Sequence, residues 1–429
     1  MNKLIDVDNF KIKFLNILFI LIPLSFIVGN LMLNINIFLF IALSLFFYKN
    51  KIFEIKIIFI DKIVFFFFSY TVLVAIANYI ESHYLRSQTV NFYLAGKSLF
   101  YLRYLFLYIV TRYLIEKNLL NFKWFFVSSS CLCLFVSLDI FYQFIFNKDI
   151  FGFVLQHSRK ISGPFGSELI AGGYLQRFFV FFVFLILGFF PTKKNFLLII
   201  VFIAIIFTAT ILSGNRMPFV LLLLIILLIA IFEKKIRFLL IISLSIFFLI
   251  FYFVPKKHDI KANIGNFTKH TSELLKLPFT RKIDRNKLPN LFQEFESFYD
   301  TWLMNKYIGG GIRSFRINCP NRNNININER VTCNTHPHNY YLEILTDLGL
   351  IGLVIISILF FFIFYNSFIK KYFLKTKFLD GNILTPFIFI FIAEVFPIKS
   401  SGSFFTTLNS TFLFLIISII VGLSQKKLR

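Results

Sequence analysis

The chain has 429 residues, of which 58% are hydrophobic, and its 45 lysines and arginines against 21 aspartates and glutamates give a net charge of +24. Apolar runs of membrane-spanning length recur along the whole sequence, which excludes a water-soluble globular domain and predicts an all-α polytopic membrane protein. Most of the basic residues stand in short segments between these runs, where membrane topology explains them. The positive charge therefore does not indicate nucleic-acid binding.

About twelve apolar segments are predicted to form transmembrane helices. They lie near residues 12–30, 31–48, 58–77, 92–115, 122–146, 167–190, 195–212, 217–232, 236–254, 338–366, 382–397 and 405–423. The first has basic residues before it but no small-residue cleavage site, so we expect a retained helix and not a signal peptide. Short lysine-rich loops alternate with loops that carry almost no charge. The positive-inside rule then predicts that both termini lie in the cytoplasm.

The predicted spans divide the chain into three parts. Residues 1–254 contain the first nine spans, 255–337 form one long loop, and 338–429 contain the last three spans. The long loop is rich in Lys and Arg, yet the alternation places it on the outer side, because long loops escape the positive-inside rule. It is the only segment large enough to fold outside the bilayer.

Two cysteines of the long loop predict either a disulfide or a metal site. An outer compartment is oxidising, which favours a disulfide between Cys319 and Cys333 close to His336. The alternative is a zinc site formed by Cys333, His336 and His338. That set lacks a fourth ligand at a familiar spacing, and we expect no metal.

Five ionisable residues fall inside predicted spans, where charges are costly and usually face a cavity or a partner. They are Lys97, Arg103, Asp139, Arg177 and Glu394. With the predicted topology each lies in the outer half of its span, which indicates a shared polar cavity that opens outward. For Asp139 and Arg177 the alternative is a local pair, or a side chain that reaches the interface.

Two turns lie on the predicted outer side, and the first of them is a candidate site for a phosphate. Ser213–Arg216 leads into a helix whose N-terminus faces outward, so its free N–H groups and the Arg216 charge form a candidate anion site. An interfacial arginine is the alternative. Gly309–Phe315 is a glycine-rich turn that carries Arg313.

The segment Thr335–Gly352 runs from a polar loop into an apolar helix. Pro337 is a residue type that opens helices, which predicts that His338 lies in the first turn. A neutral imidazole there is a candidate general base. The alternative is a polar, interfacial start of a helix with no catalytic role.

A motif within this segment resembles the signature of the O-antigen ligase and polymerase superfamily. It consists of His338 and Asn339, then Gly349 after nine residues, then Gly352 after two more. Upstream, in that family's order, stand the Ser162–Phe165 turn and the two outer turns described above.

The resemblance implies a glycosyltransferase of the type-C membrane architecture with one large periplasmic loop, in the bacterial inner membrane. Its donor would be a glycan linked to undecaprenyl diphosphate, used at the periplasmic face, with the polyprenyl tail against apolar spans and membrane lipid. In the ligases the acceptor is the lipid A-core; another glycan or a protein hydroxyl stays open. No cofactor, metal or nucleotide is implied.

The resemblance also assigns roles to single residues. His338 matches the family histidine that acts on the acceptor hydroxyl, and Arg216 matches an arginine that holds the donor diphosphate. The family's second loop arginine has no match in the stretch before Gly309; Arg281 or Arg285 could replace it.

Arg313 is a weaker candidate for the family's second loop arginine. His336 is a further substrate-binding candidate. Lys97 and Arg103 would add positive charge for the departing diphosphate.

Two alternatives stay open. A polymerase, which joins repeat units, shares all these motifs with a ligase. A secondary transporter would also carry intramembrane charges along its pathway, although the sequence shows no repeat symmetry.

Overall fold

The computed structural model describes residues 2–81, 92–156, 160–253, 290–322, 333–400 and 402–426. Within these ranges the chain is helical, with one isolated β-bridge between Lys148 and Val154 and no strand. The helices are α1 (Asn2–Ile20), α2 (Ile22–Val28), α3 (Asn30–Tyr48), α4 (Phe59–Ile80), α5 (Phe92–Tyr101), α6 (Arg103–Glu116), α7 (Phe122–Phe146), α8 (Ala171–Phe178), α9 (Val180–Phe189), α10 (Lys193–Leu212), α11 (Arg216–Phe232), α12 (Arg237–Phe253), α14 (Asn290–Met304), α15 (Phe315–Asn318), α16 (Tyr340–Phe364), α17 (Lys370–Tyr372), α18 (Gly381–Glu394) and α19 (Thr407–Gln425), with short 3-10 or π turns η1 (Lys49–Glu54), η3 (Gly163–Phe165), η6 (Cys319–Asn321) and η7 (Tyr365–Ile369).

The all-α polytopic fold predicted from the sequence is confirmed. Eight helices in the described ranges are long and apolar enough to cross a membrane, or nine if the bent pair α1–α2 counts as one span. The pair bends by 42° near Pro23, which opens α2 and cannot continue the hydrogen bonding of α1. Helices α11 and α18 are apolar but shorter. The number of twelve spans stays a prediction, although each predicted segment contains a helix or a helix pair.

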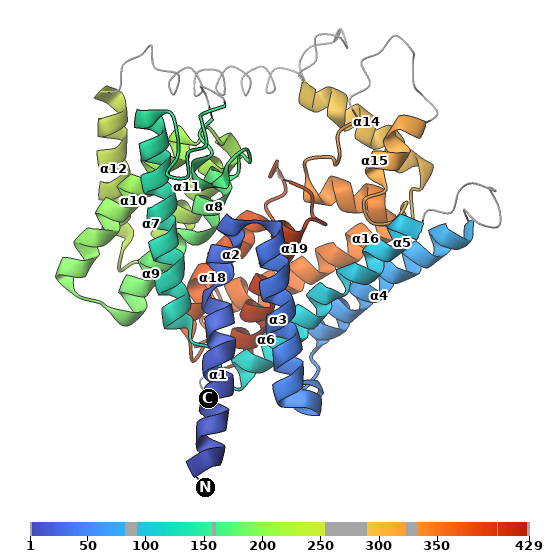
Figure 1. The fold of residues 1–429 in the computed structure, drawn as a ribbon, viewed down its shortest axis with the longest axis horizontal. Helices are drawn as coiled ribbons and strands as arrows, with labels where there is room; N and C mark the ends of the chain where they lie inside the picture. The colour runs from blue at the N-terminus through green and yellow to red at the C-terminus, as the bar shows by residue number, and fades with distance from the viewer. Residues whose placement is uncertain are drawn as a thin grey trace.

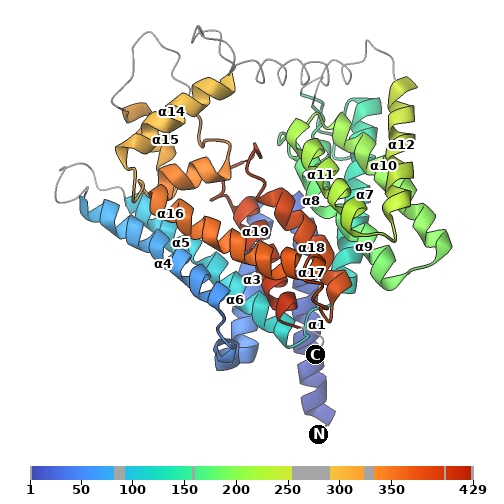
Figure 2. The same ribbon diagram turned by 180° about the vertical axis from the view of Figure 1, so that it is seen from behind.

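The helices form two lateral groups with a central layer between them (Figure 1). Helices α7 to α12 make one group, and α4, α5, α14, α15 and the start of α16 make the other (Figure 2). Helices α18 and α19 lie between the groups. Helix α1 begins at one end of the bundle, and α14 and α15 lie at the opposite end.

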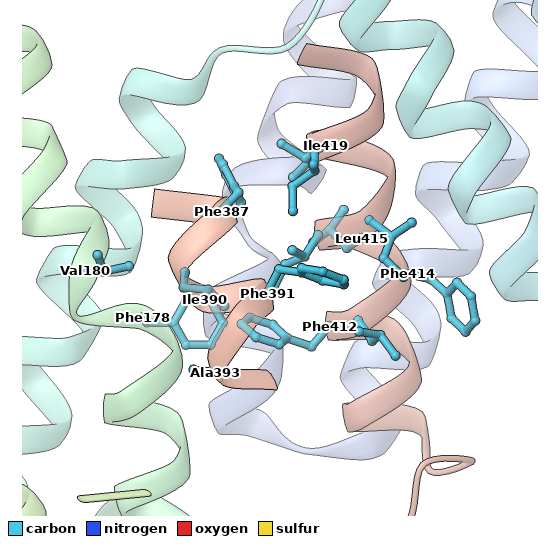
Figure 3. Packing of buried hydrophobic residues seen from close by; sticks show 14 of the residues in the cluster. Phe178, Val180, Phe387, Ile390, Phe391, Ala393, Phe412, Phe414, Leu415 and Ile419 are labelled. Atoms are coloured by element: carbon cyan, nitrogen blue, oxygen red, sulfur yellow. The ribbon is translucent and has the colours of Figure 1, made fainter. Parts of the chain in front are cut away.

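Helix α19 forms the centre of the core. Its residues from Ser410 to Ser424 are all buried, as expected for a helix that is apolar on every side. Figure 3 shows Phe412 and Leu415 of this helix packed against Phe391 of α18 and Phe178 of α8. The centres of the Phe412 and Phe178 rings are 5.4 Å apart. Aromatic packing therefore joins the central layer to the α7–α12 group.

Helix α16 is kinked at Gly349, which has φ 68° and ψ −172°. The backbone of the segment that follows α14 packs against the kink. The N–H of Leu350 donates to the carbonyl of Lys306 at 2.9 Å, and the N–H of Ile351 donates to that of Tyr307 at 3.2 Å. Backbone groups that lose their helical partners at the kink are thus satisfied from another segment, as an apolar environment requires.

Helix α4 supports the kink from the other side. The hydroxyl of Tyr70 donates to the carbonyl of Leu348 at 3.0 Å, and the side-chain amide of Asn78 donates to the carbonyl of Gly309 at 3.1 Å. The kink and the glycine-rich turn are therefore fixed together at the end of the bundle that carries α14 and α15.

Candidate functional site

His338 lies just before α16 and not in its first turn. The helix begins at Tyr340, and Asn339 is its N-cap: the Asn339 side-chain oxygen accepts from the second and third helical N–H groups at 2.9 and 3.2 Å. His338 has φ +51°, a left-handed conformation that a right-handed helix does not contain. The prediction that Pro337 opens the helix is therefore wrong, because the capping residue Asn339 makes Tyr340, three residues after Pro337, the first helical residue.

Asn339 also holds a second segment against this helix start. Its amide nitrogen donates to the carbonyls of Pro397 and Lys399, at 2.8 and 3.2 Å. These two residues belong to the loop between α18 and α19. The rings of His336 and His338 pack edge to face, with centroids 4.4 Å apart. The half-buried His338 ring thus lies where two loops meet.

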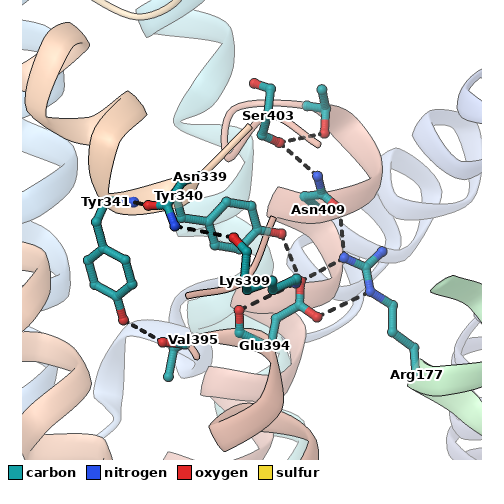
Figure 4. Close-up of polar contacts among 10 residues, drawn as sticks. Arg177, Asn339, Tyr340, Tyr341, Glu394, Val395, Lys399, Ser403 and Asn409 are labelled. Carbon is teal, nitrogen blue, oxygen red and sulfur yellow. Dashed lines mark hydrogen bonds and ion pairs between the residues drawn. The ribbon is translucent and has the colours of Figure 1, made fainter. Parts of the chain in front are cut away.

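A buried ion network supports this junction (Figure 4). Its centre is Glu394, the last residue of α18, which accepts from Arg177 at 2.6 and 3.2 Å and from the Tyr340 hydroxyl at 2.8 Å. Lys399 forms an ion pair with the same carboxylate at 2.7 Å, and Arg177 also donates to Asn409 at 2.6 Å. The network joins α8, α16, α18 and α19. Arg177 and Glu394 therefore pair with each other, as in the local-pair alternative.

Three of the predicted substrate-binding residues line one cavity of about 310 Å³. They are Lys97 of α5, Arg103 of α6 and Arg313 of the glycine-rich turn. We call this cavity the basic pocket. Its walls include Phe405. The preceding residue, Phe404, packs edge to face with Tyr340.

Hydrogen bonds fix both arginines of the basic pocket. Arg103 donates to the Tyr104 hydroxyl at 2.7 Å and to the Thr407 hydroxyl at 3.2 Å. Arg313 donates to the Phe405 carbonyl at 3.4 Å and has a left-handed backbone with φ +65°. A non-glycine residue in this conformation is strained, a feature that concentrates at functional sites.

Arg216 lies elsewhere. It is the exposed first residue of α11, in the α7–α12 group, whereas the basic pocket is lined by α3, α5, α6, the glycine-rich turn and the start of α19. The turn before Arg216 packs closely on α8: a Cβ added to Gly172 would be 2.6 Å from the Ser213 hydroxyl and 2.8 Å from the Asn215 Cβ. The structure thus separates the positive charges expected at one site into two.

A family model described as O-antigen ligase matches residues 199–357. No curated protein matches the chain. The matched O-antigen ligase domain begins in α10 and ends in α16, so it contains both Arg216 and His338. The match and the apolar helices together support a multi-pass membrane enzyme of the O-antigen ligase or polymerase type, a group that acts in lipopolysaccharide biosynthesis.

Two acidic residues of the O-antigen ligase domain escaped the sequence analysis. The first, Glu343, accepts from the Ser403 hydroxyl and from the Phe404 N–H, both at 2.5 Å. The second, Asp347, accepts from the N–H groups of Arg313 and Phe315 at 2.6 and 3.1 Å. Both carboxylates are buried and hold the loops that line the basic pocket. Acidic residues four apart in an apolar helix were a signal that could have found them.

Asp139 does not belong to a shared cavity. One of its carboxylate oxygens accepts from the N–H of Ile150 at 2.8 Å, so it holds the turn that follows α7. The predicted common cavity is therefore wrong for Asp139 and for the Arg177–Glu394 pair, and it survives for Lys97 and Arg103. The sequence placed all five charged residues in the outer halves of their spans. Position along a span does not determine which helix faces contact each other.

The cysteines of the O-antigen ligase domain form a disulfide. The sulfurs of Cys319 and Cys333 are 2.03 Å apart, and the Cα atoms 5.8 Å. Because zinc binds a thiolate, a disulfide-bonded Cys333 cannot serve in the alternative zinc set with the two histidines. Arg281 and Arg285 lie outside the described residues.

Proposed function

We propose that this protein is a glycosyltransferase that moves a glycan from undecaprenyl diphosphate to an acceptor hydroxyl, acting as an O-antigen ligase on lipid A-core. One observation carries the proposal: the O-antigen ligase match spans Arg216 and His338 in a single domain. The geometry agrees with a two-substrate enzyme, because Arg216 and the basic pocket carry positive charge on two separate sets of helices.

His338 acts as the general base in this proposal. One imidazole nitrogen takes the proton of the acceptor hydroxyl while the hydroxyl oxygen bonds to the anomeric carbon. The bond between that carbon and the diphosphate oxygen breaks, and undecaprenyl diphosphate leaves with the electron pair. Asn339, which is bonded to the helix N-terminus on one side and to Pro397 on the other, holds the histidine loop in place.

Arg216 stabilises the departing diphosphate. It begins α11, so the free N–H groups and the positive dipole end of a 17-residue helix lie beside its guanidinium. Positive charge that is already in place stabilises the developing negative charge without reorganisation. Fixed cations of this kind do what a metal ion does in other phosphate-handling enzymes, so we expect no metal requirement.

We place the active site at the periplasmic face and both termini in the cytoplasm. Short lysine-rich loops on the side of the N-terminus support this orientation. Helices α14 and α15, which carry the disulfide-linked part of the long loop, lie at the opposite end (Figure 1).

The test is a gel of surface lipopolysaccharide from a strain that lacks the protein. A ligase predicts a core without any O-sugar, together with accumulated lipid-linked chains. A core that carries a single repeat unit would instead identify a polymerase. An unchanged ladder would contradict both roles, and a substrate-flux assay would then test the transporter alternative.

A further inference from the structure

The basic pocket carries three cations and no carboxylate among the described residues that line it. Lys97, Arg103 and Arg313 converge on one cavity from three separate elements. Like charges gathered in a partly enclosed site repel one another, and a bound anion relieves that repulsion. The buried Glu343 carboxylate, which does not line the pocket, balances part of the Arg313 charge. The buried Nε of Arg103, unpartnered among the described residues, still favours an anion in the pocket.

The arginine side chains are held ready for such a ligand. The Arg103 guanidinium is anchored on Tyr104 and Thr407, and its buried Nε has no hydrogen-bond partner in the described part of the chain. The Arg313 main chain is fixed in a strained conformation by its N–H bond to Asp347. An anchored guanidinium can bind two oxygens of a phosphate or a carboxylate at a small entropic cost.

The walls of the basic pocket indicate that the anion is part of a sugar. Phe100 is 72% exposed and is the aromatic ring open to a ligand, whereas Tyr101 and Phe405 are buried in the wall behind it. Aromatic faces pack against the apolar C–H faces of sugar rings, and the polar groups of Asn34 and Thr407 can reach sugar hydroxyls. A cavity of about 310 Å³ has room for more than a bare ion, since small-molecule sites measure roughly 300–1,000 Å³.

The position of the pocket points to the acceptor and not to the donor. Arg216, which we assign to the donor diphosphate, begins α11 of the α7–α12 group, and no residue of that group lines the pocket. The pocket is joined to the histidine loop through the first residue of α16: the rings of Tyr340 and Phe404 pack edge to face with centroids 5.3 Å apart, and the next residue, Phe405, lines the pocket. A transferase must hold its two substrates on different sides of the group that joins them.

We infer that the basic pocket binds an anionic sugar of the acceptor, either a phosphate-bearing or a carboxylate-bearing one. The inference rests on the proposed function and specifies its second substrate. Donor and acceptor would then be recognised by separate positive charges, with Arg216 for one and the basic pocket for the other.

The test measures KM separately for donor and acceptor, with purified full-length protein in nanodiscs. The variants are Arg103→Gln and Arg313→Gln, and the matched control is Arg316→Gln, an exposed arginine of α15 outside the pocket. The acceptor is supplied as intact core lipid, after phosphate removal, and after carboxyl reduction. Arg313→Gln loses one long hydrogen bond of 3.4 Å, and thermal unfolding verifies that it folds.

We expect each pocket variant to raise the acceptor KM at least about tenfold, the effect of losing a charge-assisted hydrogen bond, with the donor KM unchanged. Removal of phosphate or of carboxylate should raise the wild-type KM similarly and identify the anion. The variants should lose this discrimination, and Arg316→Gln should retain it.

Three results would overturn the inference. A raised donor KM with an unchanged acceptor KM would assign the pocket to the donor diphosphate. Unchanged values for both would exclude an anion site, and so would equal KM values for all three acceptors. A preference for a second lipid-linked diphosphate over core lipid would keep the anion site and identify the acceptor as that of a polymerase.

A direct binding measurement separates failure of the inference from failure of the proposed function. Lipid-free anionic core oligosaccharide is titrated into the protein by calorimetry, without donor. Binding that Arg313→Gln weakens about tenfold supports the pocket even if no transfer is detected. Equal affinity of wild type and variant contradicts the pocket even if transfer proceeds.

Discussion

Gly309 and Gly349 lie in backbone contact across the kink of α16. A Cβ added to Gly309 would be 2.5 Å from the Gly349 nitrogen, and a Cβ added to Gly349 would be 2.2 Å from the Tyr307 carbonyl oxygen. Neither position has room for a side chain. The glycine of the helix and the glycine of the turn therefore fit each other, and the fit holds Arg313 at the basic pocket.

Replacing Gly349 by alanine should destabilise the protein strongly. The conformation at φ 68° and ψ −172° is essentially restricted to glycine, which costs an alanine about 1–3 kcal/mol, and the overlap with Tyr307 adds to that cost. Gly311→Ala is the matched control, because Gly311 also has a positive φ of +95° but nothing within 4 Å of an added Cβ. Thermal unfolding in detergent measures both. Equal losses would show that the backbone contact is unimportant.

Asn339 has two functions that two substitutions separate. Asn339→Ala removes the N-cap and the bonds to Pro397 and Lys399, so it should cost about 0.5–2 kcal/mol of stability and also lower transfer. Asn339→Asp keeps the capping oxygen but loses the amide donor. It should unfold near the wild-type temperature and still transfer slowly. If Asn339→Asp transferred at the wild-type rate, the bonds to the loop would have no role in positioning His338.

Glu394→Gln should be among the most destabilising single changes in the chain. Glu394 is fully buried and balances Arg177 and Lys399, and removal of one partner of a buried pair costs about 3–5 kcal/mol. The double variant Arg177→Gln/Glu394→Gln should cost less than the sum of the single variants, because the single changes leave unpaired charge.

A more exposed ion pair provides the control for that experiment. Asp380 and Lys426 pair at 3.6 Å with 30% and 13% of their side chains exposed. Asp380→Asn should therefore cost no more than about 1 kcal/mol. Similar melting temperatures for Asp380→Asn and Glu394→Gln would contradict the central role of the buried network.

The proposed general base is best removed by His338→Asn. Asparagine tolerates the left-handed conformation at φ +51° better than most residues, so this change removes the imidazole without adding backbone strain. Transfer should fall about 10²–10⁴-fold, the usual contribution of a general base, while thermal unfolding stays unchanged. His336→Asn is the neighbouring control and should lose less. Wild-type transfer by His338→Asn would exclude the assigned role.

Hydrophobic patterning predicted the membrane fold because a chain in lipid must satisfy its backbone hydrogen bonds internally, which leaves helices as the solution for long apolar segments. It did not predict the breaks. Helices α5 and α6 separate at Leu102, and α8 and α9 at Phe179, without a proline at either position. The kink at Gly349 depends on a segment some 40 residues earlier in the chain. Such contacts have no local signature.

The site was predictable to a similar extent. The cost of charge in lipid singled out Lys97, Arg103, Arg177 and Glu394, all of which the structure uses. Their partners could not be deduced, since Arg177 and Glu394 are 217 residues apart. The start of α16 was predicted wrongly from Pro337, because Asn339 is a capping residue and the helix begins directly after it.

The length of α18 has a consequence for how substrates reach the enzyme. Its 14 residues rise only about 21 Å at about 1.5 Å each, against a hydrocarbon thickness of about 30 Å. With α18 starting at the cytoplasmic surface, as in the proposed topology, the loop that follows it would lie below the opposite surface of the bilayer; Figure 1 shows this loop below the ends of α12 and α14. A molecule tethered to a lipid tail can enter such a recess sideways from the bilayer. Water-soluble sugars must descend into it, so the architecture itself favours substrates that arrive with an anchor.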